Sequence, residues 1–104
     1  MLGPLEREVL SVMNQIKEGT VRDVHKILKQ DKKLAYTTVS TTLERLFDKG
    51  YLTRGRQTGL GGTRYVYKMK NVEGKLAKMF VDEFMSMFGK TGVSSLHEEL
   101  DKYE

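Results

Sequence analysis

Five of the six residues from Thr37 to Thr42 carry hydroxyl groups, and Arg45 follows three positions later. Hydroxyls hydrogen-bond to phosphates and base edges, threonine methyls pack on thymine methyls, and arginine binds guanine O6 and N7. Because serine and threonine are indifferent helix formers, a helix rich in them favours a nucleic-acid contact over a merely solvated face on which Arg45 pairs with Asp48. The candidate contact residues are Thr37, Thr38, Ser40, Thr41 and Arg45.

A second group of candidates is basic. Between Lys49 and Lys70 there are six basic residues and no acid, which indicates an anionic partner. We assign Arg54, Arg56 and Arg64 to phosphate or minor-groove contacts, with solubility as the alternative. Thr20 and Arg22 begin a predicted helix, where free backbone N–H groups attract phosphate. Capping of that helix by Thr20 explains the same residues equally well.

Other site chemistries find little support in the chain. His25 and His97 lie far apart and in no metal-ligand spacing, so we interpret both as surface histidines. The sequence has no cysteine, which removes thiolate metal sites, cysteine nucleophiles and disulfides. It also shows no phosphate-binding glycine loop before a helix and no nucleophile elbow. We therefore expect no enzyme, no metal and no cofactor.

The 104 residues suit one compact domain with a short appendage, and the charge divides unevenly along them. Residues 1–70 hold 14 Lys or Arg and 7 Asp or Glu, a net charge of +7, whereas residues 71–104 hold 4 and 7, a net charge of −3. A basic half of this kind favours a polyanion partner. No secretory signal or membrane segment is recognisable, so we expect a cytoplasmic protein without a membrane partner.

Helical spacing of apolar residues predicts three helices in the basic half. The first runs from Leu5 to Ile16 with Pro4 in its first turn, and the second from Val21 to about Lys29. The third runs from Tyr36 to Lys49, where Val39, Leu43, Leu46 and Phe47 form the apolar stripe and the hydroxyls lie opposite or beside it. Tyr36 falls towards the buried side of this helix.

Alternating residues at 52–54 and 63–69, separated by several glycines, predict a two-stranded hairpin with a long glycine-rich tip. Three helices followed by a basic hairpin is the order of a winged helix, in which the third helix enters the major groove. We therefore predict a mainly α fold with a small β-hairpin, consisting of a winged helix-turn-helix domain at 1–70 and a C-terminal helical region at 71–104.

The C-terminal region predicts a helix at about 72–88, a break at 89–92, and a short last helix capped by Ser94 or Ser95. Three of the four phenylalanines and three of the six methionines lie in the longer helix, more than one flank of a small core requires. We expect a homodimer interface there, with intramolecular packing as the alternative. Its predicted residues are Leu76, Phe80, Phe84, Met87, Phe88, Leu96 and Leu100.

Several stretches carry a family resemblance: LGPLEREVLSVM at 2–13, TVRDVHKIL at 20–28, AYTTVSTTLERLFDKGYL at 35–52 and TRYVYK at 63–68. Over residues 2–70 the chain resembles the penicillinase-repressor family of bacterial and archaeal transcription repressors, the BlaI, MecI and CopY type. The resemblance implies a homodimeric winged-helix repressor that binds double-stranded DNA at a dyad-symmetric operator and dimerises through its C-terminal helices.

Two features depart from that family. The penicillinase branch is inactivated by cleavage at an Asn-Phe bond, but the only asparagines here, Asn14 and Asn71, precede Gln15 and Val72. The copper branch uses C-terminal cysteines, which this chain lacks. The inducer, small molecule or protease, is therefore left open. The alternative function is a winged-helix protein-interaction module in a larger assembly, with an acidic protein on the basic surface.

Overall fold

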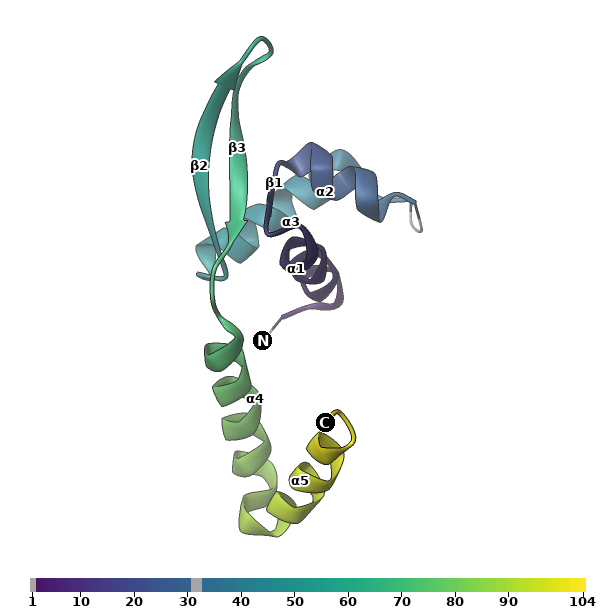
Figure 1. Cartoon of the computed structure of the whole chain (residues 1–104), viewed down its shortest axis with the longest axis vertical. Coiled ribbons are helices and arrows are strands. Elements are labelled where there is room, and N and C mark those ends of the chain that lie inside the picture. The colour runs from purple at the N-terminus through teal and green to yellow at the C-terminus, as the bar shows by residue number, and fades with distance from the viewer. Residues whose placement is uncertain (1, 31–32) are drawn as a thin grey trace. The chain divides into compact units, whose positions relative to one another are not determined.

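The computed structural model describes residues 2–30 and 33–104, and the chain divides into two compact units between Lys70 and Asn71 (Figure 1). The first unit contains α1, β1, α2, α3, β2 and β3, and the second contains α4, η1 and α5. A mainly helical fold with a small antiparallel sheet agrees with the predicted fold class. In the described part of the chain, no helix combines the length and apolar character that a bilayer crossing requires.

Three helices enclose the core of the first unit. They are α1 (Pro4–Ile16), α2 (Val21–Leu28) and α3 (Tyr36–Asp48). Each buries one apolar stripe, and the residues with no exposed surface are Val9, Met13, Val24, Val39, Leu43 and Leu46. Gly50 ends α3 with φ of 85°, and the next residue, Tyr51, donates its N–H to the Leu46 carbonyl at 2.9 Å. The core fixes which face of α3 remains exposed.

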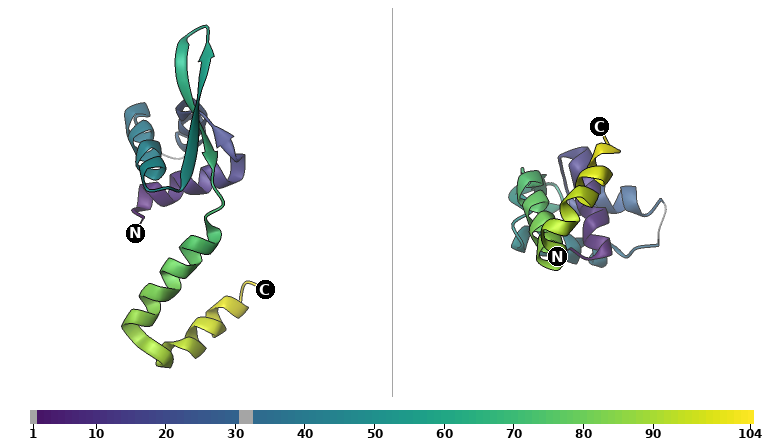
Figure 2. Two further views of the ribbon diagram at one scale, coloured as in Figure 1. Left: turned by 90° about the vertical axis from the view of Figure 1, so that its left-hand side faces the viewer. Right: turned by 90° about the horizontal axis from the view of Figure 1, so that it is seen from below.

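A three-stranded antiparallel sheet completes this unit, in the order β1 (Glu18–Gly19), β3 (Gly62–Met69), β2 (Leu52–Gly59). Strands β2 and β3 pair along their whole length, from Leu52 opposite Met69 to Gly59 opposite Gly62. Figure 1 and the left view of Figure 2 both show this hairpin projecting past the three helices. The basic residues of the hairpin are thereby held away from the core.

The elements differ from the predicted ones at four points, one of which is that Gly92, and not Ser94 or Ser95, is the N-cap of α5 (Val93–Asp101). The tip is a two-residue turn, Leu60-Gly61, instead of a long loop, because glycine N–H and carbonyl groups can still join the antiparallel ladder. The two-residue strand β1 was not predicted, since it exists only through its pairing with Tyr67 and Lys68. Tyr36 is 50% exposed and does not lie on the buried side of α3.

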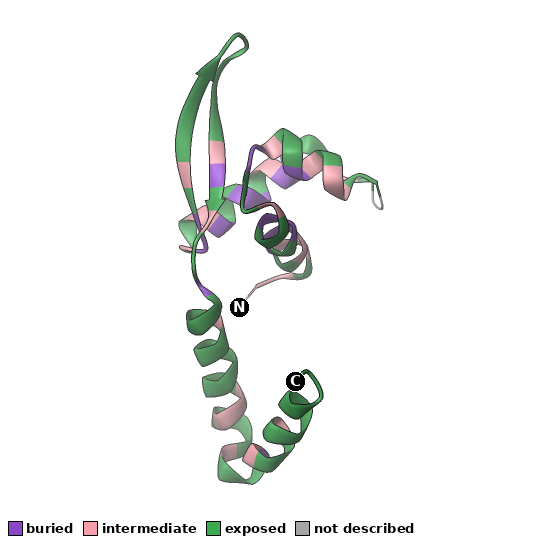
Figure 3. Ribbon diagram, viewed as in Figure 1, coloured by how far each residue is buried: buried purple, intermediate pink, exposed green. Residues whose placement is uncertain are grey.

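The second unit consists of α4 (Glu73–Phe88), the short 3₁₀ helix η1 (Gly89–Gly92) and α5 (Val93–Asp101). The two α-helices diverge from η1 (Figures 1 and 2). The Phe84 ring packs directly on Gly92, where no side chain would fit, because a Cβ there would lie 2.6 Å from Phe84 Cε1. Glycine at this position therefore allows the tight turn. No residue of α4 or α5 is buried, as the green and pink ribbon of these helices shows (Figure 3).

Candidate nucleic-acid interface

The hydroxyl-rich helix α3 keeps its predicted candidates outside the core. Thr37, Thr38 and Thr41 are exposed and Ser40 is half-buried. Thr41 Oγ1 donates to the Thr37 carbonyl at 2.9 Å, and Thr42 Oγ1 donates to the Thr38 carbonyl at 2.7 Å. These bonds satisfy the two hydroxyl protons inside the helix, while the buried stripe of Val39, Leu43 and Leu46 holds the threonine-rich segment helical. Because its hydroxyl is satisfied in this way, Thr42 is buried rather than flanking.

The segment that leads into α3 is fastened to α2 by a histidine. His25 Nε2 lies 2.7 Å from the Leu34 carbonyl oxygen, so this nitrogen carries a proton and donates it. The His25 ring also meets Tyr36 edge-on, with the ring centres 5.7 Å apart. His25 therefore positions the start of α3. Among the described residues, no cluster of His, Asp or Glu suits a metal ion.

At the start of α2, Thr20 has a structural role. Its Oγ1 accepts the Asp23 N–H at 3.2 Å, and the Asp23 carboxylate accepts the Thr20 N–H at 2.9 Å. Thr20 is buried, and its hydroxyl serves the capping box instead of facing outwards. Of the two readings of this residue, capping fits the structure better than a phosphate contact. Arg22, two residues later, is exposed.

Arg54 is placed differently from the expected phosphate contact. Its guanidinium lies 4.1 Å from the ring centre of Phe47 on one side and 4.1 Å from that of Tyr65 on the other. It also hydrogen-bonds the Tyr67 hydroxyl, which raises the pKa of Arg54, and lies 4.0 Å from the Glu44 carboxylate. Arg54 therefore joins α3 to the base of the hairpin.

The cluster around Arg54 also affects the ionisation of Tyr67 and the charge of Glu44 on the same surface. Burial raises the pKa of the Tyr67 phenol, although the hydrogen bond from Arg54 opposes the shift. The phenol therefore stays neutral. Glu44 is the acid nearest this face of the hairpin, and Arg54 offsets a charge that would repel phosphate. Sequence reasoning missed Phe47, Tyr65 and Tyr67 in this role, although the hairpin register sets Arg54 opposite Tyr67.

The other two hairpin arginines remain exposed. Arg56 lies 6.0 Å from the Tyr65 ring centre, at the outer end of the same stack. Arg64 donates from Nε and Nη2 to the Gln57 side-chain oxygen of the paired strand, at 3.3 and 3.2 Å. A neutral partner leaves the arginine charge in place, so both arginines can meet an anion.

A hollow of about 600 Å³ lies between α3 and the hairpin. It brings together predicted residues from three elements, namely Arg22 from α2, Ser40 from α3 and Arg64 from β3, while Glu44 and Tyr65 complete its wall. Thr20 also lines the hollow, but its hydroxyl caps α2. The structure thus gathers α2, α3 and the hairpin around one concave polar surface.

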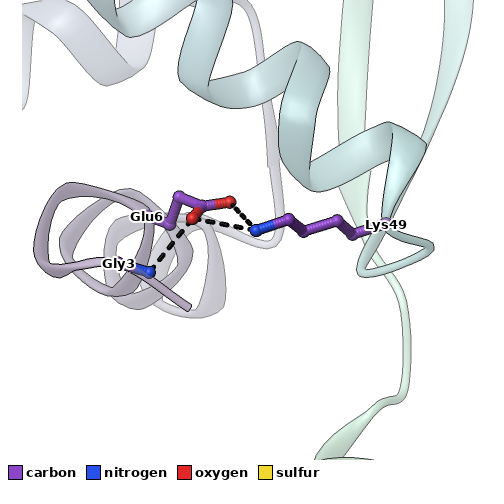
Figure 4. A network of polar contacts seen from close by, with 3 residues as sticks. All are labelled: Gly3, Glu6 and Lys49. Atoms are coloured by element: carbon purple, nitrogen blue, oxygen red, sulfur yellow. Dashed lines mark hydrogen bonds and ion pairs between the residues drawn. The ribbon is translucent and has the colours of Figure 1, made fainter. Parts of the chain in front are cut away.

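Arg45 lies on the opposite flank of α3, towards α1. There Lys49 Nζ binds the Glu6 carboxylate at 2.7 and 3.0 Å, and Glu6 accepts the Gly3 N–H at 3.0 Å (Figure 4). These bonds lower the pKa of Glu6, and the Arg45 charge adds a small contribution in the same direction. Arg45 is exposed and close to Glu6, and the alternative pairing with Asp48 is not formed.

The predicted self-association residues lie on α4, where helical spacing puts five of them on one stripe, and on α5, which holds Leu96 and Leu100. Leu76, Phe84 and Leu96 are half-buried, whereas the remaining members are exposed: Phe80 45%, Met87 65%, Phe88 55% and Leu100 54%. Phe84 packs on Phe88, with ring centres 5.1 Å apart, and on Gly92. Phe84 therefore has an intramolecular role as well as a place on the stripe.

Comparison with known proteins places these features in context. Residues 2–102 match the family model described as penicillinase repressor. The chain is similar to "Transcriptional regulator BlaI" of Mycobacterium tuberculosis (strain CDC 1551 / Oshkosh), with 43% identity over 56 residues, 53% of this chain and 41% of that protein. The chain thus spans about two fifths of the length of this curated relative.

Solved structures show the same fold. A possible transcriptional regulator from Methanosarcina mazei Go1 superposes with a TM-score of 0.64 at 22% identity, covering 99% of this chain and 80% of that one. Bacillus subtilis PadR in complex with operator DNA gives a TM-score of 0.61 at 15% identity, covering 96% and 67%. The winged-helix prediction is therefore confirmed.

Proposed function

Because the chain belongs to the penicillinase repressor family, we propose that it is a sequence-specific transcriptional repressor that binds a dyad-symmetric operator as a homodimer. In this proposal α3 lies in the major groove, the hairpin of β2 and β3 follows the flanking backbone, and the protein acts in the cytoplasm. The observation that carries it is the shared concave surface, on which an exposed hydroxyl-rich helix and a basic hairpin meet. The family is one of transcription repressors and not of enzymes.

The charges on this surface support contact with a phosphate backbone. Of the six cations from Lys49 to Lys70, three have a carboxylate within 4.0 Å: Lys49 with Glu6, Arg54 with Glu44 and Lys68 with Glu18. Arg56, Arg64 and Lys70 have no such partner among the described residues, and neither do the helix arginines Arg22 and Arg45. If each of these five cations per protomer, ten per dimer, neutralised one phosphate, the slope of log affinity against log salt would be about −9.

The second unit supports self-association. Neither α4 nor α5 buries a side chain, yet their stripe is apolar and aromatic. Helices of this length gain most of their stability from packing an amphipathic face and not from propensity. A second copy of the same stripe would cover it symmetrically, which is the commonest form of soluble oligomer.

The test is DNA binding as a function of salt. Duplexes are first recovered by the protein from a random-sequence library, and the recovered sequence is compared with a scrambled duplex between about 50 and 200 mM salt. We expect an inverted repeat and a slope on the order of −5 to −9. No recovered sequence, or an affinity flat over this range, would refute the proposal and favour a protein partner.

A further inference from the structure

The tip of the hairpin carries one side chain, and that side chain is apolar. Leu60 is 112% exposed, more than in an extended reference peptide, and stands between Gly59 on one side and Gly61 and Gly62 on the other. The outer half of the hairpin is exposed throughout (Figure 3). At this exposure Leu60 contributes nothing to the core, and it stands at the rim of the hollow between α3 and the hairpin.

The glycines beside Leu60 are equally unexplained by the fold. Gly62 has φ of 101°, a conformation that favours glycine, but Gly59 and Gly61 have no positive φ. A Cβ built at either of these two positions would meet no atom within 4 Å. Glycine at both positions leaves the backbone beside Leu60 without side chains, so another molecule can approach it closely.

Charge and reach identify that molecule as a duplex. The exposed Arg56 and Arg64 lie on the two strands that lead to the tip, and no acid occurs between Lys49 and Lys70. Eight residues per strand make the hairpin about 26 Å long at ~3.3 Å per residue. On the same side of B-DNA, major and minor groove centres are about 17 Å apart, half of a ~34 Å turn. A hairpin anchored beside α3 therefore spans this distance.

We propose that Leu60 enters the minor groove next to the segment held by α3 and presses against a base step there. Apolar side chains used in this way partly unstack the step and bend the duplex. The glycines let the backbone follow Leu60 between the sugar-phosphate walls. The tip then selects flanking sequence that is free of the guanine 2-amino group and easily unstacked. This inference rests on the proposed function.

The experiment uses the full chain and the duplex recovered from the library. One version carries G·C pairs half a turn outside each half-site, and a second carries inosine·C, which lacks the minor-groove amino group. A third carries 2-aminopurine there, whose fluorescence rises when the base unstacks. The variants are Leu60→Ala, Leu60→Met and Leu60→Lys. Gly61→Ala is compared with Gly74→Ala, a control in α4 outside the hairpin where a Cβ also meets no atom within 4 Å.

We expect the wild-type protein to prefer inosine and to raise the fluorescence. Leu60→Ala should weaken binding about tenfold, from the apolar surface lost, and remove both effects while leaving the salt slope unchanged. Leu60→Met should retain both effects. Gly61→Ala should weaken binding without lowering the unfolding temperature, whereas Gly74→Ala should bind as wild type.

Two results would overturn the inference while leaving DNA binding intact. One is a Leu60→Ala protein that binds with wild-type affinity and the same inosine preference. The other is a Leu60→Lys protein that binds more tightly with a steeper salt slope, since the tip would then lie against phosphates. A wild-type protein that recovers no duplex from the library refutes the proposed function itself.

Discussion

Replacing Phe80 by aspartate tests whether the apolar stripe of α4 is covered by a second copy. Phe80 is 45% exposed and belongs to the stripe, whereas the side chains nearest a Cβ at Gly92 are those of Phe84 and Phe88. A carboxylate at this position leaves the fold of the first unit untouched. Phe80→Asp therefore separates self-association from folding more cleanly than a change at Phe84.

The exposed fraction sets the size of the effect. An exposure of 45% leaves about 90 Å² of a roughly 200 Å² aromatic residue uncovered in one chain. At ~25 cal/mol per Å², covering this area contributes about 2 kcal/mol. Because a twofold dimer covers Phe80 of both copies, Phe80→Asp loses about 4.5 kcal/mol of association free energy, or roughly a thousandfold in the dimer Kd. The cost of placing two carboxylates in an apolar interface adds to this loss.

Sedimentation equilibrium over a range of protein concentrations measures the dimer Kd directly. Ser86→Asp is the matched control, because it adds the same charge to α4 about 120° away round the helix from Phe80. We expect Ser86→Asp to remain dimeric and Phe80→Asp to sediment as a monomer with reduced helical circular dichroism. A Phe80→Asp protein that stays dimeric at the wild-type concentration would show that a surface other than this stripe holds the dimer.

Three further results are expected. Arg45→Ala should relax base preference at one position of each half-site, whereas Arg56→Ala should weaken all duplexes alike, as a sequencing-based affinity comparison would show; equal loss for both would place Arg45 on the backbone. Thr20→Ala should lower stability by about 1 kcal/mol and Tm by ~4–8 °C without changing DNA affinity below the transition, because its hydroxyl serves the α2 cap. Since Lys49 holds the pKa of Glu6 below its ordinary value of 4.5, the pair stabilises the fold fully above that pH and less as pH falls through the lowered value. Glu6→Gln should then flatten the acid limb of Tm against pH, and an unchanged limb would mean that the pair contributes nothing.

Local patterns were enough to predict the helices and the hairpin. Pro4, the apolar spacing of α3 and the positive-φ Gly50 each act within a few residues, so the structure that they produce can be predicted from the local sequence. The two-residue strand β1 and the burial of Thr42 were not predicted. The first needs a partner strand some fifty residues away, and the second needs a hydroxyl bonded to the Thr38 carbonyl.

The candidate site, too, could be predicted from the sequence only where its features depend on neighbouring residues. The exposed hydroxyls of α3 follow from helical periodicity alone, but the role of Arg54 does not. Its type and its basic neighbourhood predict a phosphate contact, whereas cross-strand register sets it opposite Tyr67, and packing of the hairpin on α3 brings it to the rings of Tyr65 and Phe47. Counting arginines along a strand therefore overstates the charge available to a partner, because an aromatic side chain on the facing strand can hold one in place.

If α3 enters the major groove as proposed, the internal hydrogen bond of Thr41 restricts which bases that residue can read. While its proton is held by the Thr37 carbonyl, Thr41 offers the major groove only oxygen lone pairs and a methyl group. Lone pairs match the amino groups of adenine N6 and cytosine N4, and the methyl matches thymine. Guanine presents two acceptors there and finds no donor on Thr41. The centre of the α3 face is thus suited to adenine, thymine or cytosine, and a guanine in the half-site belongs to Arg45 on the flank.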